Sequence, residues 1–330
     1  MMKEETMYKM NRNFAVGSDI SWYPQMLADG FVFKNSKGKE QDLLTTLKEY
    51  NHNAIRLRTW VEPSDDPRSG HCSAEETLDF AKQCNEAGFR IMLNFHYGDT
   101  WCDPGKQVKP KSWEGLAFDD LVTALYDYTY ETVQLLVSGG VTPEWVQIGN
   151  ETNPGMVLPD GSAKDFEKLT RLYNAGHDAI KAASPSSKTM IHLAEFNDPD
   201  FIINYFDNLE KHDCRYDMMG FSFYPYHLKN FHGMSYEESF AGWNHAMREI
   251  PQKYGKEFQI VEIGGPDEDE EESFNLIMDA IKSIHSEPLC TGLFWWEPEG
   301  ARVWSHYPLN AWRADGTPTK AMDAFNAIGY

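Results

Sequence analysis

The sequence has no long hydrophobic run and little positive charge. Nowhere do about 18 apolar residues follow one another, which is the minimum for a membrane-spanning helix. Lys and Arg number 30 against 51 Asp and Glu, giving a formal net charge of −21. Nucleic acids and anionic membrane surfaces bind clustered Lys and Arg, so neither is expected as a partner. A polyanionic substrate is disfavoured for the same reason, and a neutral ligand fits best.

Cysteines are also few. The five cysteines include no Cys-x-x-Cys pair, and no His-rich spacing suited to zinc accompanies them. Free thiols in the core are therefore expected, and no zinc site is indicated. The only charge run, 267–272, is expected to be a solvated loop that enters a helix, with a calcium site as the alternative.

Strand-like and helix-like segments alternate along the whole chain, without a linker or repeat that would divide it. This pattern predicts one α/β domain over residues 1–330, a (β/α)8 TIM barrel, with a poorly ordered segment at about 1–12. A doubly wound sheet is the alternative, but no Gly-x-Gly-x-x-Gly follows the first strand. The expected strands are 14–20, 54–60, 90–96, 145–150, 189–194, 218–224, 258–263 and 292–296. The expected helices are 43–50, 74–87, 118–138, 163–183, 199–211, 236–254 and 272–285.

Polar or aromatic residues fall at or just beyond the carboxyl ends of nearly all these strands. Barrels place their active sites on that face. Ala194, at the end of the fifth expected strand, is the exception. The residues in question are Asp19, Arg58, His96, Asn150, Glu151, Tyr224, Glu262 and Trp296.

Two of these residues, Glu151 and Glu262, follow the fourth and seventh expected strands. Hydrolysis of a sugar acetal needs one carboxylic acid to protonate the leaving oxygen and a second carboxylate across the ring. In retaining enzymes these groups stand about 5–5.5 Å apart. Strands four and seven lie across the barrel interior, so we expect Glu151 to be the acid/base and Glu262 the nucleophile.

Their polar neighbours have expected supporting roles. Asn150 suits a hydrogen bond to a sugar 2-hydroxyl, and Tyr224 suits donation to Glu262. Arg58 would keep Glu262 ionised, or would belong to an ion pair that only buttresses the barrel. His96 is expected to orient neighbouring groups, and a core tyrosine is the other interpretation of Tyr224.

Aromatic residues make up 14% of the chain, which suits either a packed core or a cleft that stacks on sugars. Trp296 closes the eighth expected strand, where an indole would form a floor for a pyranose; a core tryptophan is the alternative. The long polar loop after the third strand, 97–107, is expected to shape a cleft.

At these residues the chain resembles glycoside hydrolase family 53, the arabinogalactan endo-β-1,4-galactanases of clan A. The similar segments cover residue 14 to about 298, nearly the whole chain. Thr59, Glu62 and the Glu-Ile-Gly at 262–264 depart slightly from the family pattern. The segments read GSDISW at 17–22, RLRTWVEP at 56–63, FHYGDTWCDPGKQ at 95–107, QIGNETNPGM at 147–156, VEIG at 261–264 and FWWEP at 294–298.

The resemblance implies a retaining hydrolase that cleaves internal β-1,4-galactosyl bonds in pectic galactan, without a cofactor. Within its motifs, Asp19, Trp22, Asp99, Trp101 and Trp296 are expected to contact substrate. It also implies a secreted, periplasmic or cell-surface enzyme whose export signal is absent here. A calcium site is not carried over, because 264–273 looks too short for the insertion that holds it. Mannan or xylan specificity, and a non-catalytic glycan-binding barrel, remain the alternatives.

Overall fold

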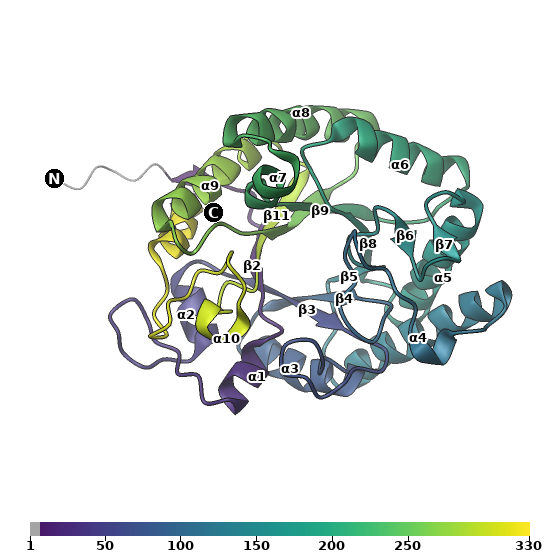
Figure 1. Cartoon of the computed structure of the whole chain (residues 1–330), viewed down its shortest axis with the longest axis horizontal. Helices are drawn as coiled ribbons and strands as arrows, with labels where there is room; N and C mark the ends of the chain where they lie inside the picture. Colours follow the sequence, from purple (N-terminus) through teal and green to yellow (C-terminus); the bar gives the residue numbers. More distant parts are fainter. Residues whose placement is uncertain (1–6) are drawn as a thin grey trace. The chain divides into compact units, whose positions relative to one another are not determined.

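A computed structural model describes residues 7–330 and has a closed β-barrel at its centre (Figure 1). Eight strands form this barrel in the order β10-β11-β2-β3-β4-β5-β8-β9. The strand pairs with a described register are parallel, and helices follow the strands along the chain. The predicted (β/α)8 barrel is therefore confirmed. Its strands are β2 (Ala15–Asp19), β3 (Ala54–Thr59), β4 (Arg90–Phe95), β5 (Trp145–Gln147), β8 (Lys188–Leu193), β9 (Met218–Phe223), β10 (Phe258–Ile263) and β11 (Cys290–Trp296).

By its internal contacts the chain divides into two compact units. Unit 1 comprises Met1–Ile55 and Phe223–Tyr330, and unit 2 comprises Arg56–Ser222. The expectation of a single domain stays a prediction.

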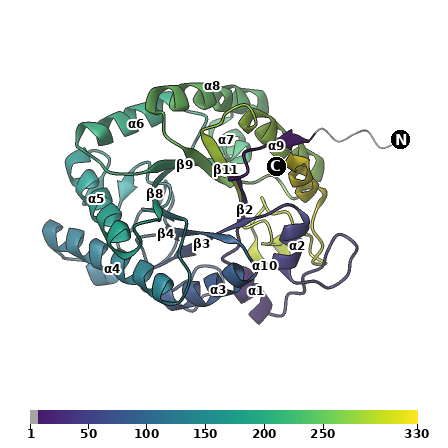
Figure 2. The same ribbon diagram turned by 180° about the vertical axis from the view of Figure 1, so that it is seen from behind.

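Unit 2 contains β4, β5 and β8, whose helices lie outside the strands (Figures 1 and 2). The register of β5 is continuous with both neighbours: Val146 is paired with Leu93 on one side and Thr189 on the other. Helices α4 and α5 pack against each other. The unit's helices are α3 (Ala74–Glu86), η1 (Lys111–Trp113), α4 (Phe118–Ser138), α5 (Phe166–Ala183) and α6 (Pro199–Lys211), and a small hairpin joins β6 (Gly155–Met156) to β7 (Gly161–Ser162).

Unit 1 contains β10, β11 and β2, which pair in that order. The register between β11 and β2 runs unbroken and sets Trp296 beside Asp19. Strands β1 (Tyr8–Lys9) and β12 (Ile328–Gly329) pair with each other. The helices are α1 (Tyr23–Ala28), α2 (Leu43–Glu49), α7 (Pro225–His232), α8 (Tyr236–Tyr254), α9 (Glu270–Ile284), α10 (Arg302–Ser305) and η2 (Lys320–Ala327).

The acidic run enters a helix, as predicted: Asp269 caps α9 and accepts a hydrogen bond from the Glu272 N–H at 2.9 Å. The run is also paired, because Asp267 and Glu268 contact Arg302. Of the segment predicted to be poorly ordered, 1–6 lie outside the described residues and Tyr8–Lys9 form β1. Within residues 7–330, no helix combines the length and the apolar character needed to cross a bilayer.

Candidate functional site

The chain turns sharply after β5, and this turn carries Glu151. Gly149 has a φ of 86° and Glu151 a φ of 46°, a left-handed conformation that is unusual for a residue with a side chain. Gln107 holds the turn by donating its amide to the carbonyls of Asn150 (2.8 Å) and Glu151 (3.2 Å). The turn is thus fixed by a side chain from the 97–107 loop. A strained residue held in this way is a common feature of active sites.

Asn150 is locked in place by its own amide. Its Oδ1 accepts hydrogen bonds from Arg56 Nη2 at 2.8 Å and Asn94 Nδ2 at 3.0 Å. Its Nδ2 donates to the carbonyl of Cys102 at 2.8 Å. An amide nitrogen carries two protons, so one remains for another acceptor. This orientation is compatible with the expected contact to a sugar hydroxyl, which stays a prediction.

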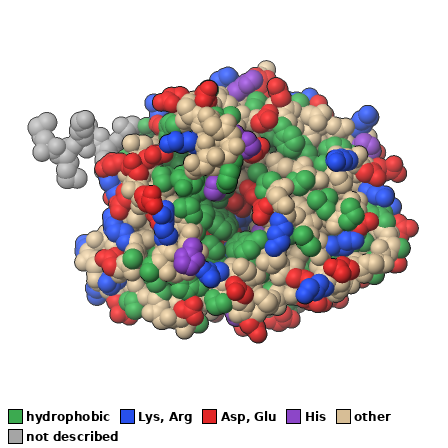
Figure 3. Space-filling model, viewed as in Figure 1, with side chains coloured by type: hydrophobic (Ala, Val, Ile, Leu, Met, Phe, Trp, Pro, Cys, Tyr) green, Lys and Arg blue, Asp and Glu red, His purple; other side chains and the backbone are tan. Residues whose placement is uncertain are grey.

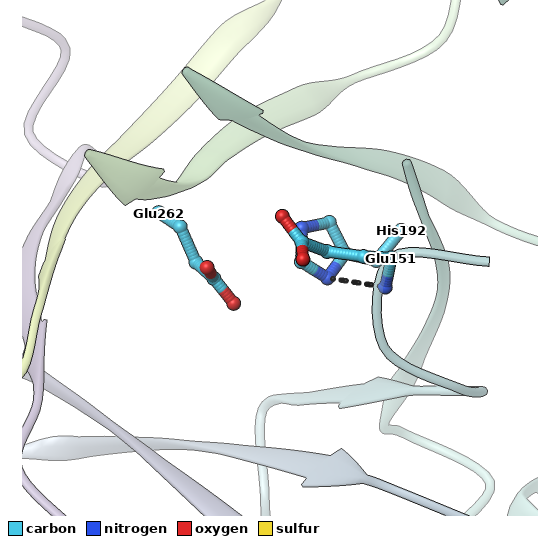
Figure 4. Close-up of side chains that lie close together, drawn as sticks. All are labelled: Glu151, His192 and Glu262. Atoms are coloured by element: carbon cyan, nitrogen blue, oxygen red, sulfur yellow. Dashed lines mark hydrogen bonds between the residues drawn. The ribbon is translucent and has the colours of Figure 1, made fainter. Parts of the chain in front are cut away.

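His192, near the end of β8, supports Glu151 and was not anticipated from the sequence. Burial and then the positive charge of Arg56 hold its pKa well below the usual value, so the ring is neutral. Its Nδ1 accepts the Glu151 backbone N–H at 3.3 Å (Figure 4), and Nε2 lies 2.8 Å from Ser222 Oγ. A neutral ring with its proton on Nε2 satisfies these two contacts, whereas the contact of Nδ1 with Asn150 Oδ1, at 3.1 Å, requires the proton on Nδ1.

Glu262 lies one residue before the end of β10, and the Tyr224 hydroxyl donates a hydrogen bond to its Oε2 at 3.0 Å. This is the contact expected from the sequence. Both glutamates are largely buried, with 9% of Glu151 and 5% of Glu262 exposed.

Both nitrogens of His192 have hydrogen-bonding partners: the Glu151 N–H and Asn150 Oδ1 at Nδ1, and Ser222 Oγ at Nε2. A metal ion bound at His192 would displace one of them. The absence of a metal stays a prediction.

The predicted residues of β3 and of the loop after β4 form a second cluster in unit 2. His96 accepts the Cys102 N–H at Nδ1 (3.0 Å), and burial, with Arg56 and Arg58, keeps its pKa well below normal. The Arg58 guanidinium lies 4.3 Å from the centre of the Trp101 ring. His96 thus fixes the loop, as an orienting residue would. Asp99 accepts backbone N–H groups at both oxygens, from Glu62 (3.1 Å) and Lys111 (2.9 Å).

In unit 1, an aromatic cluster surrounds Trp22. We define it as Trp22, Trp296, Trp304 and Tyr307, whose ring centroids lie 5.3, 5.9 and 6.1 Å from that of Trp22. Figure 3 shows hydrophobic side chains gathered over the ends of β2 and β11. Trp22 is buried, whereas Trp296 is partly exposed, as a ring that stacks on a ligand must be. Asp19, also predicted to contact substrate, is buried and accepts the Ser21 N–H and hydroxyl at Oδ1.

The sequence of this chain is similar to a family of known proteins. The model of glycosyl hydrolase family 53 matches residues 15–284. An endo-beta-1,4-galactanase of Bacillus subtilis is 30% identical over 77% of this chain and 57% of its own length. An arabinogalactan endo-beta-1,4-galactanase of Thermothelomyces thermophilus is 29% identical over 84% of this chain and 86% of its own length.

A solved structure agrees with this result. The family 53 catalytic domain of Ignisphaera aggregans superposes with a TM-score of 0.87 at 28% identity, covering 96% of this chain and 97% of that domain. The family model alone covers most of the chain, including both glutamates. This chain belongs to glycosyl hydrolase family 53.

Proposed function

We propose that the protein is a retaining endo-β-1,4-galactanase that cleaves pectic galactan by double displacement. Glu151 is the acid/base and Glu262 the nucleophile. The single observation that carries this proposal is that each carboxylate has its own hydrogen-bonding support, Glu151 through its backbone N–H to His192 and Glu262 through the Tyr224 hydroxyl. Galactan is proposed as substrate because characterised relatives carry the name endo-β-1,4-galactanase.

The reaction proceeds in two steps. The Glu262 carboxylate attacks C1 of the galactosyl residue while the Glu151 carboxylic acid protonates the departing glycosidic oxygen. Water then attacks C1 of the galactosyl–Glu262 ester, with Glu151 now accepting its proton. The Glu262 carboxylate leaves, and the product keeps the β configuration.

The surroundings of each glutamate suit its proposed role. The Tyr224 hydroxyl donates to Glu262, which stabilises the carboxylate form and aims it. In the turn that carries Glu151, the carbonyls of Asn150 and Glu151 accept hydrogen bonds from Gln107, and the Glu151 N–H donates one to His192, so the side chain starts from a fixed backbone. A fixed acid/base avoids the cost of ordering it in each catalytic cycle.

A substrate screen tests the specificity. The purified protein is incubated with linear β-1,4-galactan, mannan, xylan and cellulose, and the products are sized. We expect release of short galacto-oligosaccharides from galactan well before the free monosaccharide, as an endo-acting enzyme requires. Preferential cleavage of mannan or xylan would reject galactan, and binding without turnover would favour a glycan-binding barrel.

Variants test the residue roles. Glu262→Ala should abolish hydrolysis while leaving binding of galacto-oligosaccharides detectable, and Glu151→Ala should lower kcat on galactan by about 10²–10⁴-fold. Proton NMR should show the β-anomer of the product first; an α-anomer formed first would refute retention. The matched control is Glu257→Ala, at the residue that precedes β10, the strand carrying Glu262. Full turnover by Glu262→Ala would remove that residue from its role.

The proposal includes a location. A polysaccharide substrate is too large to cross a membrane intact, so we propose that the enzyme acts outside the cytoplasm, as a secreted, periplasmic or cell-surface protein. Fractionation of the native host grown on galactan tests this. Activity confined to the cytoplasm would contradict it.

A further inference from the structure

Two glutamates that the proposed reaction does not use lie directly after β11. Glu297 and Glu299 are both 0% exposed. Glu297 has a left-handed backbone with a φ of 47°, and its N–H donates to the Asp19 carbonyl at 2.8 Å. Its Oε2 accepts the backbone N–H of Trp22 at 3.2 Å. Glu297 therefore ties the segment after β11 to the start of α1.

Glu299 is the less usual of the two. Neither of its carboxyl oxygens accepts a hydrogen bond from an N–H or O–H group of another described residue. Burial, the charge of Glu297, a hydrogen bond with Glu297 and the charge of Asp19 raise the pKa of Glu299 well above its usual value and outweigh a hydrogen bond from its own backbone N–H, which lowers that pKa. A buried carboxylate that no other residue supplies with a donor is too costly to keep ionised. Glu299 is thus a carboxylic acid at neutral pH, with a proton to donate.

We propose that the Glu299 acid donates a hydrogen bond to the Glu297 carboxylate and that this pair is a positioning device for Trp22 and the aromatic cluster. Glu297 then accepts hydrogen bonds from Glu299 and from the Trp22 backbone. The proposal rests on the proposed function, since it assigns the aromatic cluster to sugar binding. Glu297 and Glu299 act through Trp22 and take no part in the chemistry.

The packing around Trp22 explains why such a device would matter. A Cβ at Gly300 would lie 2.8 Å from Trp22 Cε3, so the 297–300 segment fits tightly against the indole. Trp22 is in edge contact with Trp296, the partly exposed member of the cluster, at 5.3 Å. A shift in the backbone of Trp22 would therefore displace the ring proposed to stack on sugar.

Two substitutions of similar size separate the donor role from packing. Glu299→Gln keeps a neutral hydrogen-bond donor, whereas Glu299→Met has none. On galactan we expect Glu299→Gln to keep KM and kcat within about twofold of wild type. Glu299→Met should raise KM about tenfold, the size of one lost hydrogen bond to a charged group, with little change in kcat. Glu287→Gln, just before the start of β11, is the matched control and should match wild type.

Two measurements without substrate keep this test independent of the proposed function. The infrared spectrum of the wild type should contain the C=O band of a buried protonated carboxyl group, and Glu299→Gln should lose it. Tryptophan emission and its quenching by acrylamide should change in Glu299→Met and stay unchanged in Glu299→Gln. Thermal melting confirms that each variant is folded.

Three results would overturn the proposal. They are a carboxyl band that persists in Glu299→Gln, equal KM values in Glu299→Gln and Glu299→Met, and wild-type tryptophan emission in Glu299→Met. A wild-type protein that does not cleave galactan but shows the expected infrared and emission changes would reject the proposed function alone. That result would still support the Glu297–Glu299 pair as the positioning device for the aromatic cluster.

Discussion

The hydroxyl of Tyr224 donates a hydrogen bond to Oε2 of Glu262 at a distance of 3.0 Å. Tyr224 directly follows β9 and precedes α7, whereas Glu262 belongs to β10. The phenol thus fixes a carboxylate on the neighbouring strand.

Removal of this hydroxyl should slow the reaction without unfolding the protein. In Tyr224→Phe the Glu262 carboxylate loses a neutral donor, and a hydrogen bond to a charged group contributes about 1.5–3 kcal/mol. We expect kcat/KM on galactan to fall about 10- to 100-fold, measured by release of reducing ends. Tyr226→Phe, on α7 itself, is the control. An unchanged rate in Tyr224→Phe would show that Glu262 needs no such support.

Trp296 offers a test of stacking. Its ring is partly exposed and packs edge-on against Trp22 and against Tyr307, at 5.3 and 4.8 Å. Trp296→Ala should weaken substrate binding by about 1–3 kcal/mol, mainly as a rise in KM for galactan. Titration calorimetry with galacto-oligosaccharides on a Glu262→Ala background isolates the binding step. Affinity within error of the parent would count against a stacking role.

Gly149 allows the turn to be tested against a matched glycine. Gly149 and Gly140 have similar positive φ values, 86° and 91°. A Cβ at Gly149 would lie 2.6 Å from Thr152 Cγ2, whereas one at Gly140 would meet nothing within 4 Å. Both alanine variants should lose about 1–2 kcal/mol of unfolding free energy from the left-handed backbone. Gly149→Ala should lose additional unfolding free energy because its Cβ would collide with Thr152. It should also lower kcat, because the turn that carries Glu151 would shift. Equal stability and activity in the two variants would contradict this role of the turn.

Acid should destabilise the fold through His52. This ring is buried between Ser18 Oγ (3.0 Å) and the Tyr50 carbonyl (3.1 Å), and burial lowers its pKa from 6.5 to about 4. Between these values the unfolded chain binds a proton that the folded chain does not. The free energy of unfolding therefore falls as the pH drops from 6.5 towards 4, by about 3 kcal/mol from this group.

Urea denaturation at several pH values measures the effect. The wild type should lose more stability than His52→Gln between neutral pH and about pH 4, because the variant lacks the titrating ring. His245→Gln, on the exposed surface of α8, should follow the wild type. If the free energy of unfolding changes with pH equally in the wild type and in His52→Gln, the pKa of His52 is the same in the folded and unfolded states, and the prediction is wrong.

Hydrophobic periodicity predicted the long helices well. Residues 118–138, 199–211 and 236–254 form helices with the predicted bounds. Long amphipathic segments repeat their pattern over several turns, so it stands out from chance. The short helices α1, α7 and α10 were not predicted, because four to eight residues give few repeats of that pattern. The seven-residue α2 was nevertheless predicted, from the spacing of Leu43, Leu44 and Leu47.

The candidate site was predicted less completely. Glu151, Glu262 and Tyr224 were predicted because they stand at or just beyond the ends of the expected strands. The fourth barrel strand, however, stops at Gln147 and not at Asn150 as expected, because the left-handed residues Gly149 and Glu151 leave the extended conformation. The role of His192 depends on this turn, since its partner is the backbone N–H of Glu151.

The sequence contains one indication that the side chain of His192 faces the barrel interior. His192 lies two residues before Ala194, the end of the expected strand, so alternation places both on one face. Glu297 stands within the FWWEP segment, but nothing in the order of residues reveals that Glu299 is buried beside it. That arrangement follows from how 297–300 folds against Trp22.

The pairing of β1 with β12 determines where a second domain fused to this protein would be attached. Asn53 donates to the Phe14 carbonyl and to the Tyr330 hydroxyl, which brings the last residue to the start of β2, at the opposite end of that strand from Asp19. A carbohydrate-binding module joined through Tyr8 or through Gly329, on these paired strands, would therefore be tethered at nearly the same point. Reversing the order of a fusion should change its reach along a polymer very little.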